Sequence, residues 1–194
     1  MKKDAIRTLV KERIELGYTR QMVLDELVAI HPEVKPKRIA DVVRYQATLL
    51  AREQYRDQQR GLLVAVLLYG ALELFRPMIT GEFRGGGVAQ WFQVLPFATL
   101  FLGYQVHRWR GEGFQWLAIV NFLSALGLLG LPEKIREGGF PVWATIGDLL
   151  SLVIAALAWH LAHRMFSAPK VEKDPAGSLP PRYVFPAEHS AALL

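Results

Sequence analysis

Long apolar runs fill most of the second half of the chain. They cover residues 61–80, 88–106, 113–131 and 140–163. Each is close to the roughly 20 residues that a helix rising about 1.5 Å per residue needs to cross the hydrocarbon core of a bilayer. Glycines and charged residues separate the runs, as in GEFRGGG and PEKIREGG. The pattern predicts an all-α fold built on a four-helix transmembrane bundle.

Before the first run, apolar and charged residues recur at the spacing of amphipathic helices. The first helix is expected over residues 3–16 and ends at Gly17. The second is expected over residues 19–31, with Thr19 as its N-cap. These two helices each have one apolar side, so the pattern predicts a small helical domain outside the bilayer.

A third amphipathic helix is expected to start at Pro36, because proline suits the first turn of a helix. No helix breaker lies between residues 37 and 60, where the sequence passes through AREQYRDQQR. We therefore expect the third helix to continue into the first membrane span as one long rod.

The end of the chain, from residue 167 onward, is rich in proline, alanine and serine. This composition favours an extended tail without a core of its own. If part of the tail docks onto another part of the protein, we expect that part to be Tyr183, Val184 and Phe185.

The predicted domains are a helical domain with a juxtamembrane helix (1–60), the transmembrane bundle (61–166) and the extended tail (167–194). Residues 1–60 hold thirteen Lys or Arg and nine Asp or Glu, which is +4 of the formal net charge of +5. Basic segments near membrane spans favour the cytoplasmic side. Both termini are therefore expected in the cytoplasm. No cleavable signal peptide is predicted, and we expect a bacterial inner (plasma) membrane location.

The sequence LVKERIELGYTRQMVLDELVAIHPEVKPKRIADVVRY contains Leu16-Gly17-Tyr18 followed by Thr19. Residues 4–46 resemble a UBA-like three-helix domain, in which Met-Gly-Phe or Met-Gly-Tyr opens the second helix. Leu16 and the loop HPEVKP depart from the family pattern. The resemblance implies a protein-binding module that uses Gly17 and Tyr18. The alternative is a cap that packs on the bundle or on itself.

A nucleic-acid partner is a weaker interpretation of KPKRIADVVR, the basic segment around the third helix. Acidic residues interrupt any phosphate-binding face of this domain. We therefore expect no nucleic-acid partner. Three arginines just before the first span, Arg52, Arg56 and Arg60, are expected on one helix face at the anionic lipid headgroups.

Ionisable residues inside a membrane span are costly and usually face the interior of the bundle. Glu73 and Asp148 lie at similar predicted depths, and Arg76 is one helical turn from Glu73. Gln93 and Asn121 lie near the same level or deeper. Together these five residues form a predicted intramembrane polar cluster. It either binds an ion, proton or small solute, or only holds the helices together.

The small residues Gly147, Ser151 and Ala155 favour the packing interpretation, because a spacing of four lets another helix approach closely. The histidines His107 and His160, with His163, leave open a metal or haem site at the cytoplasmic level. No cofactor or metal is assigned to them.

The chain contains no cysteine and no phosphate-binding, HExxH or GxSxG motif, so the sequence does not favour an enzyme. The predicted function is a non-enzymatic membrane subunit. It would form homo-oligomers, contact membrane lipids and couple a cytoplasmic protein partner to the bundle. The alternative is a small oligomeric channel or transporter that uses the polar cluster.

Overall fold

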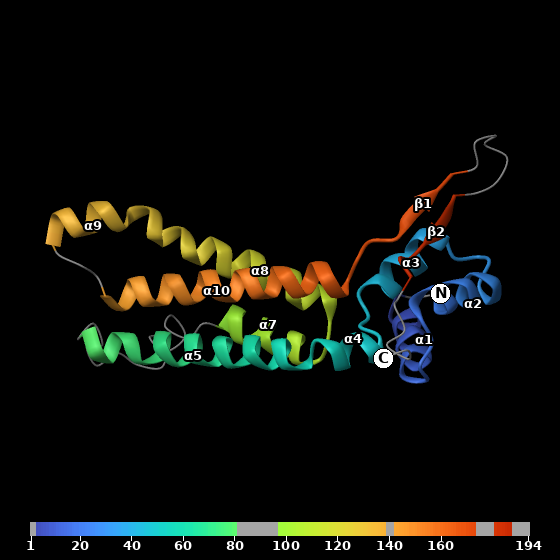
Figure 1. Cartoon of the computed structure of the whole chain (residues 1–194), viewed down its shortest axis with the longest axis horizontal. Coiled ribbons are helices and arrows are strands. Elements are labelled where there is room, and N and C mark those ends of the chain that lie inside the picture. Colours follow the sequence, from blue (N-terminus) through green and yellow to red (C-terminus); the bar gives the residue numbers. More distant parts are fainter. Residues whose placement is uncertain (1–2, 81–96, 139–141, 174–180, 188–194) are drawn as a thin grey trace. The chain divides into compact units, whose positions relative to one another are not determined.

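The computed structural model describes residues 3–80, 97–138, 142–173 and 181–187. Most of these residues are helical, so the predicted all-α class is confirmed (Figure 1). The elements in chain order are α1 (Lys3–Glu15), α2 (Arg20–Ile30), α3 (Pro36–Arg44), α4 (Leu49–Gln54), α5 (Arg56–Thr80), α7 (Phe97–His107), α8 (Gly111–Ala125), the 3-10 helix η1 (Leu126–Gly130), α9 (Leu131–Gly138), α10 (Val142–Met165), β1 (Lys170–Glu172) and β2 (Arg182–Val184).

The chain forms two compact units, and each is described by itself. The N-terminal unit comprises Met1–Arg56, Trp109–Gly111 and Ala162–Leu194, and the apolar unit comprises Asp57–Arg108 and Glu112–Leu161. The division differs from the predicted domains. Residues 57–60 belong to the apolar unit, whereas the end of α10, the link before α8 and the tail belong to the N-terminal unit.

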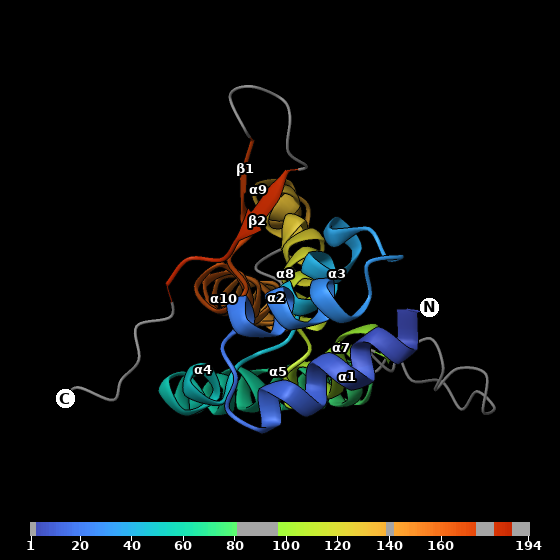
Figure 2. The same cartoon turned by 90° about the vertical axis from the view of Figure 1, so that its right-hand side faces the viewer.

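The core of the N-terminal unit is made by the apolar sides of α1, α2 and α3, which are drawn in shades of blue in Figure 2. Ile6, Val10 and Ile14 recur every four residues along α1 and are fully buried. This spacing places them on one helix face, so the amphipathic pattern of the sequence accounts for the core. The buried apolar residues of the other two helices are Val23, Leu24, Leu27, Ile39, Ala40, Val42 and Val43.

Gly17 ends α1 in a Schellman motif. Its amide donates to the Ile14 carbonyl at 3.0 Å, and the Tyr18 amide donates to the Arg13 carbonyl at 3.2 Å. Gly17 has φ +90°, a left-handed conformation that glycine adopts without a steric cost. Thr19 then caps α2, since its hydroxyl accepts from the Met22 amide. The Gly-Tyr-Thr turn therefore has a structural explanation of its own.

The predicted rod from α3 into α5 is wrong, because the helix is interrupted twice. α3 ends at Arg44, and Thr48 starts α4 by accepting a hydrogen bond from the Ala51 amide. The Tyr45 carbonyl, which leaves the helical pattern, accepts from the Gly111 amide at 3.1 Å. In a continuous helix, an amide of the same helix would donate to this carbonyl. Here the Gly111 amide, far along the chain, donates to it instead.

The tail differs from the expected extended chain, because β1 and β2 pair as an antiparallel hairpin. Val171 lies opposite Tyr183 at the centre of the register. Phe185 follows β2 and is only 5% exposed within the core of the N-terminal unit. Its backbone amide donates to the Gln21 side-chain oxygen at 2.9 Å. The tail therefore contributes a core residue to the domain at the other end of the sequence.

Two helical stretches of the described chain are long and apolar enough to cross a membrane, Gly111–Glu133 and Val142–Met165. They correspond to the third and fourth predicted spans. The first predicted span, residues 61–80, is helical throughout as part of α5. The second begins at residue 88, and its first part lies outside the described residues.

Within the apolar unit, α5 and α7 pack closely where glycines remove side chains from the interface. A Cβ at Gly70 would lie 2.9 Å from Leu100 Cδ2, and a Cβ at Gly103 would lie 2.8 Å from Val66 Cγ1. Gly70 of α5 faces Leu100 of α7. Val66, which is earlier in α5, faces Gly103, which is later in α7. The two helices are therefore antiparallel, as expected for neighbours in an up-and-down bundle.

Candidate functional site

The polar residues of the apolar unit begin with an ion pair on α5. Arg76 Nη1 lies 3.2 Å from Glu73 Oε1 and 3.1 Å from Oε2. The two residues are three apart, so the helix itself places them on one side. The Glu73 side chain is 15% exposed and that of Arg76 is 38% exposed. Glu73 is thus the more deeply placed member of the pair.

Asp148 of α10 is next to Glu73. Glu73 Oε1 lies 3.0 Å from where a Cβ at Gly147 would be, and the negative charge of Asp148 acts on Glu73. Asp148 Oδ2 lies only 2.6 Å from the corresponding Cβ position at Gly127. Each carboxylate therefore occupies space that a glycine leaves open.

Sequence reasoning missed Tyr69 and Ser151 as members of this site. The Tyr69 side chain lies near the hydroxyl groups of Ser151 and Ser124. Tyr69 is four residues before Glu73, and Ser151 is three after Asp148, so both lie one helical turn from a carboxylate. This spacing is the signal in the sequence that could have found them.

Asn121 of α8 is a fully buried polar residue of the apolar unit. Its Nδ2 donates to the Leu117 carbonyl at 2.9 Å. Its Oδ1, like the buried Ser151 Oγ, has no hydrogen-bond partner among the described residues. We call Glu73, Asp148, Tyr69, Ser151 and Asn121 the polar row. Gln93, the remaining predicted cluster residue, lies outside the described residues.

Apolar side chains are buried further along the same three helices. They are Leu62 of α5, Leu117 of α8 and Ala158 of α10. We call these three residues the apolar floor. The buried Gln59 of α5 lies beyond them, so the interior is not apolar throughout.

A second set of polar contacts, also missed from the sequence, lies in the N-terminal unit at the end of α10. Arg20 Nη2 donates to the Met165 carbonyl at 2.7 Å, and Arg44 Nε donates to the Phe166 carbonyl at 3.2 Å. Arg20 is 5% exposed, and its guanidinium carbon lies 5.9 Å from the centre of the Phe185 ring. Cations are favourable at helix C-termini, where carbonyls lack partners within the helix.

The predicted partner-binding residues lie on an exposed part of the N-terminal unit. Tyr18 is 36% exposed, and its neighbours Leu16 and Met22 are 64% and 53% exposed. These three side chains place apolar surface around the Gly17 turn. We call Leu16, Tyr18 and Met22 the turn patch.

The three predicted headgroup arginines do not belong to one continuous helix. Arg52 lies in α4, whereas Arg56 and Arg60 lie in α5. Arg52 Nε donates to the Ala47 carbonyl at 3.1 Å, and partial burial lowers the pKa of its guanidinium despite the opposing effect of Glu15. Arg60 forms an exposed ion pair with Asp57 at 3.6 Å. Arg52 therefore makes a hydrogen bond to the backbone of the N-terminal unit, a contact that does not depend on lipid headgroups.

The side chains of His107, His160 and His163 are all exposed. Among the residues that the structure describes, no three His, Asp or Glu side chains gather as a group that could hold a metal ion. The site that can be built from the described residues is thus the polar row rather than a histidine centre.

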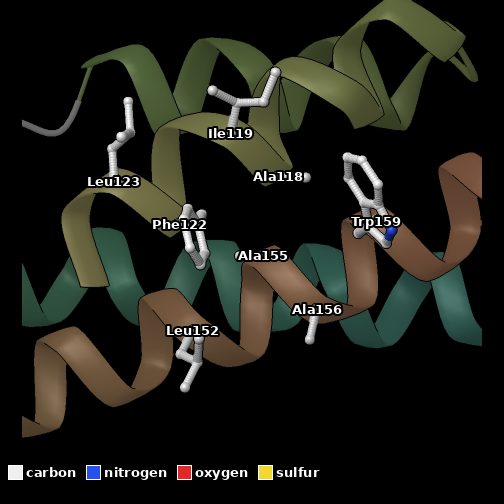
Figure 3. A pocket seen from close by; sticks show the side chains of 8 residues that line it. All are labelled: Ala118, Ile119, Phe122, Leu123, Leu152, Ala155, Ala156 and Trp159. Carbon is white, nitrogen blue, oxygen red and sulfur yellow. The ribbon is translucent and has the colours of Figure 1, made fainter. Parts of the chain in front are cut away.

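A groove of about 410 Å³ lies between α8 and α10, and Figure 3 shows the side chains that line it. Phe122 extends from α8 toward α10, and Trp159 extends from α10 toward α8 (Figure 3). Ala118 and Ala155 leave space between these rings. Since every lining residue is apolar apart from the indole nitrogen, the groove has no chemistry for a polar substrate.

Comparison of the chain with protein-family models, with curated proteins and with solved structures found no match.

Proposed function

We propose that the chain is an integral membrane protein that crosses the bilayer four times. Only 28% and 33% of the most apolar windows of Gly111–Glu133 and Val142–Met165 are buried within the molecule. Leu129 is 78% exposed and Trp159 is 62% exposed. An apolar helix in the core of a soluble protein would be mostly buried, so a lipid environment accounts better for this surface.

The composition of the N-terminal unit supports an even number of crossings. Its residues come from both ends of the chain and from the Trp109–Gly111 link between α7 and α8. A unit on one side of the membrane requires an even number of crossings before this link and an even number after it. The two apolar stretches after the link form one such pair, and residues 61–80 and 88–106 form the other.

Within this topology, we assign the protein the role of a non-enzymatic membrane subunit that couples a cytoplasmic protein-binding unit to the bundle. The observation that carries the assignment is the buried hydrogen bond from Arg20 to the Met165 carbonyl. Met165 is the last residue of α10, so this contact joins the N-terminal helices to the end of a proposed membrane helix. A partner bound at the turn patch would act on α2, the helix that starts with Arg20.

The test is native mass spectrometry of the tagged protein released gently from its own membrane. We expect a homo-oligomer that carries a stoichiometric second protein. Met22→Glu should remove the second protein, because it introduces a charge into the turn patch. Ile30→Glu is the matched control, since Ile30 is 55% exposed at the other end of α2. A bare monomer for the unmodified protein would contradict the proposal, as would equal loss of the partner from both variants.

The polar row supports a second candidate, a small oligomeric channel or transporter. The observation that favours this candidate is the pair of buried oxygen atoms that make no hydrogen bond among the described residues, Ser151 Oγ and Asn121 Oδ1. Ion flux into proteoliposomes tests this candidate. Asp148→Asn should abolish flux while leaving the oligomer intact, whereas a residue that only packs helices should tolerate the nearly isosteric amide.

A further inference from the structure

The polar row contains oxygen-bearing side chains at successive levels along the interior of the apolar unit. Glu73 lies against Gly147 and Tyr69 lies near Ser151, so α5 and α10 are antiparallel. Residues three apart in a helix differ in height by about 4.5 Å. Glu73 and Asp148 therefore form the first level, and Tyr69 and Ser151 form the second.

Asn121 forms the third level. Gly127 of η1 lies beside Asp148, and Asn121 precedes Gly127 by six residues along the same helical stretch. Asn121 is consequently about 9 Å deeper than the carboxylates. The polar row thus continues from the two carboxylates into the interior rather than forming one compact cluster.

Two buried oxygen atoms along this row make no hydrogen bond among the described residues, although the Tyr69 side chain lies near one of them, Ser151 Oγ. Ser151 is 1% exposed and Asn121 is 0% exposed, and Ser151 Oγ and Asn121 Oδ1 have no hydrogen bond among the described residues. A buried polar group without a partner is costly, and most such groups in proteins are satisfied by protein atoms or ordered water. Two of these groups on facing helices indicate an occupant that supplies the missing contacts.

The charge of the row indicates which solutes would enter. Glu73, Asp148 and the nearby Arg76 together carry one net negative charge when all are ionised. A single positive charge would balance them, and the remaining groups supply oxygen atoms that contact water or a cation. The apolar floor of Leu62, Leu117 and Ala158 then closes the row.

We propose that the polar row is a blind, water-filled inlet that admits small monovalent cations from the Glu73 and Asp148 end as far as Asn121. The inlet goes beyond the coupling role and does not depend on it, although it rests on the proposed membrane placement. It also gives the packing residues Gly147 and Gly127 a second role, since they leave room for the two carboxylates at its entrance.

The chain has no cysteine, so any introduced cysteine is the only thiol in the protein. The experiment uses the full chain in lipid nanodiscs with Ser151→Cys or Asn121→Cys. Ag⁺, a small monovalent cation that binds thiols, is added for timed intervals. The protein is then unfolded, and mass spectrometry counts the thiols that a maleimide still modifies. Ala158→Cys, seven residues from Ser151 in the apolar floor, is the matched control.

We expect Ag⁺ to protect Ser151→Cys and Asn121→Cys at least about tenfold faster than Ala158→Cys. In the Ser151→Cys protein, adding Asp148→Asn should slow protection by about tenfold, because a unit charge roughly 5 Å away strongly affects a cation in a partly dry interior. Neutral methyl methanethiosulfonate should react at an unchanged rate with the same two proteins. This comparison separates the effect of charge from that of access.

Equal protection of Ser151→Cys and Ala158→Cys would overturn the inlet and leave a dry packing layer. If Ag⁺ protected Ser151→Cys at the same rate with and without Asp148→Asn, the preference for cations would be overturned. Ser151→Cys decides both points by itself if Asn121→Cys does not fold. Leu152→Cys, which is 42% exposed beside the apolar groove, tests the membrane placement separately. Rapid protection there by Ag⁺ would mean that water, not lipid, covers this face.

Discussion

Individual glycines determine where the carboxylates of the polar row lie. Gly127 and Gly147 leave open the positions beside Asp148 and Glu73, respectively. The sequence showed the acidic residues as candidates because charges are rare in apolar runs. It did not show which glycines face them, because that depends on how α5, η1 and α10 pack together. Tyr69 and Ser151 escaped notice for the same reason, although their helical spacing from the carboxylates was visible.

The close approach of Asp148 to Gly127 predicts that Gly127→Ala lowers the free energy of unfolding. The added methyl group would meet a carboxylate oxygen at 2.6 Å, and overpacking of this kind costs about 1–3 kcal/mol. Gly61→Ala is the matched control, since a Cβ at that position has no neighbour within 4 Å. Thermal unfolding in detergent measures both variants. Equal effects of the two alanines would show that Asp148 does not occupy the space beside Gly127.

Arg20 predicts a second effect on stability at the scale of one residue. Arg20→Gln should reduce the stability of the N-terminal unit by about 1.5–3 kcal/mol, the usual range for a hydrogen bond that involves a charged group. Arg38→Gln changes an exposed arginine of α3 and should alter stability by less than about 0.5 kcal/mol. Chemical unfolding of the two proteins gives the comparison. A similar loss for both would mean that general charge, not the contact with Met165, matters.

At the scale of elements, the sequence predicted most helices but neither the break before α5 nor the tail hairpin. The amphipathic pattern of α1, α2 and α3 is local and therefore readable. The break depends on the Gly111 amide, which lies far from Tyr45 in the sequence. The hairpin depends on the core that receives Phe185. Neither distant partner can be recognised from local periodicity.

The tail hairpin predicts that Phe185→Ala destabilises the N-terminal unit strongly. Phe185 is 5% exposed, and truncating a buried phenylalanine typically costs about 3–5 kcal/mol. Val171→Ala is a suitable control in the paired strand, because Val171 is 49% exposed. Hydrogen exchange of the α2 amides should increase in Phe185→Ala and remain nearly unchanged in Val171→Ala. Unchanged exchange in both would show that the tail is not part of this core.

At the scale of the whole molecule, the composition of the N-terminal unit restricts the proposed membrane topology. Lys35, Arg110 and Lys170 come from three distant parts of the sequence but belong to one unit. If that unit is cytoplasmic, all three must be cytoplasmic, whereas Arg136 of α9 lies between the last two proposed spans and must be on the other side. The shared unit supports placing the three segments on one side of the membrane, and the proposal that this side is cytoplasmic rests on the loop charges alone.

Single cysteines at these exposed positions test the topology directly. A membrane-impermeant maleimide should label Lys35→Cys, Arg110→Cys and Lys170→Cys only in inverted vesicles, which present the cytoplasmic face. Arg136→Cys should be labelled only in right-side-out vesicles. Arg110→Cys is the decisive variant, since its position counts the crossings before the link. Labelling of Arg110→Cys from the side opposite to Lys35→Cys would require an odd number of crossings between them, and both the four-span topology and a shared unit would then be wrong.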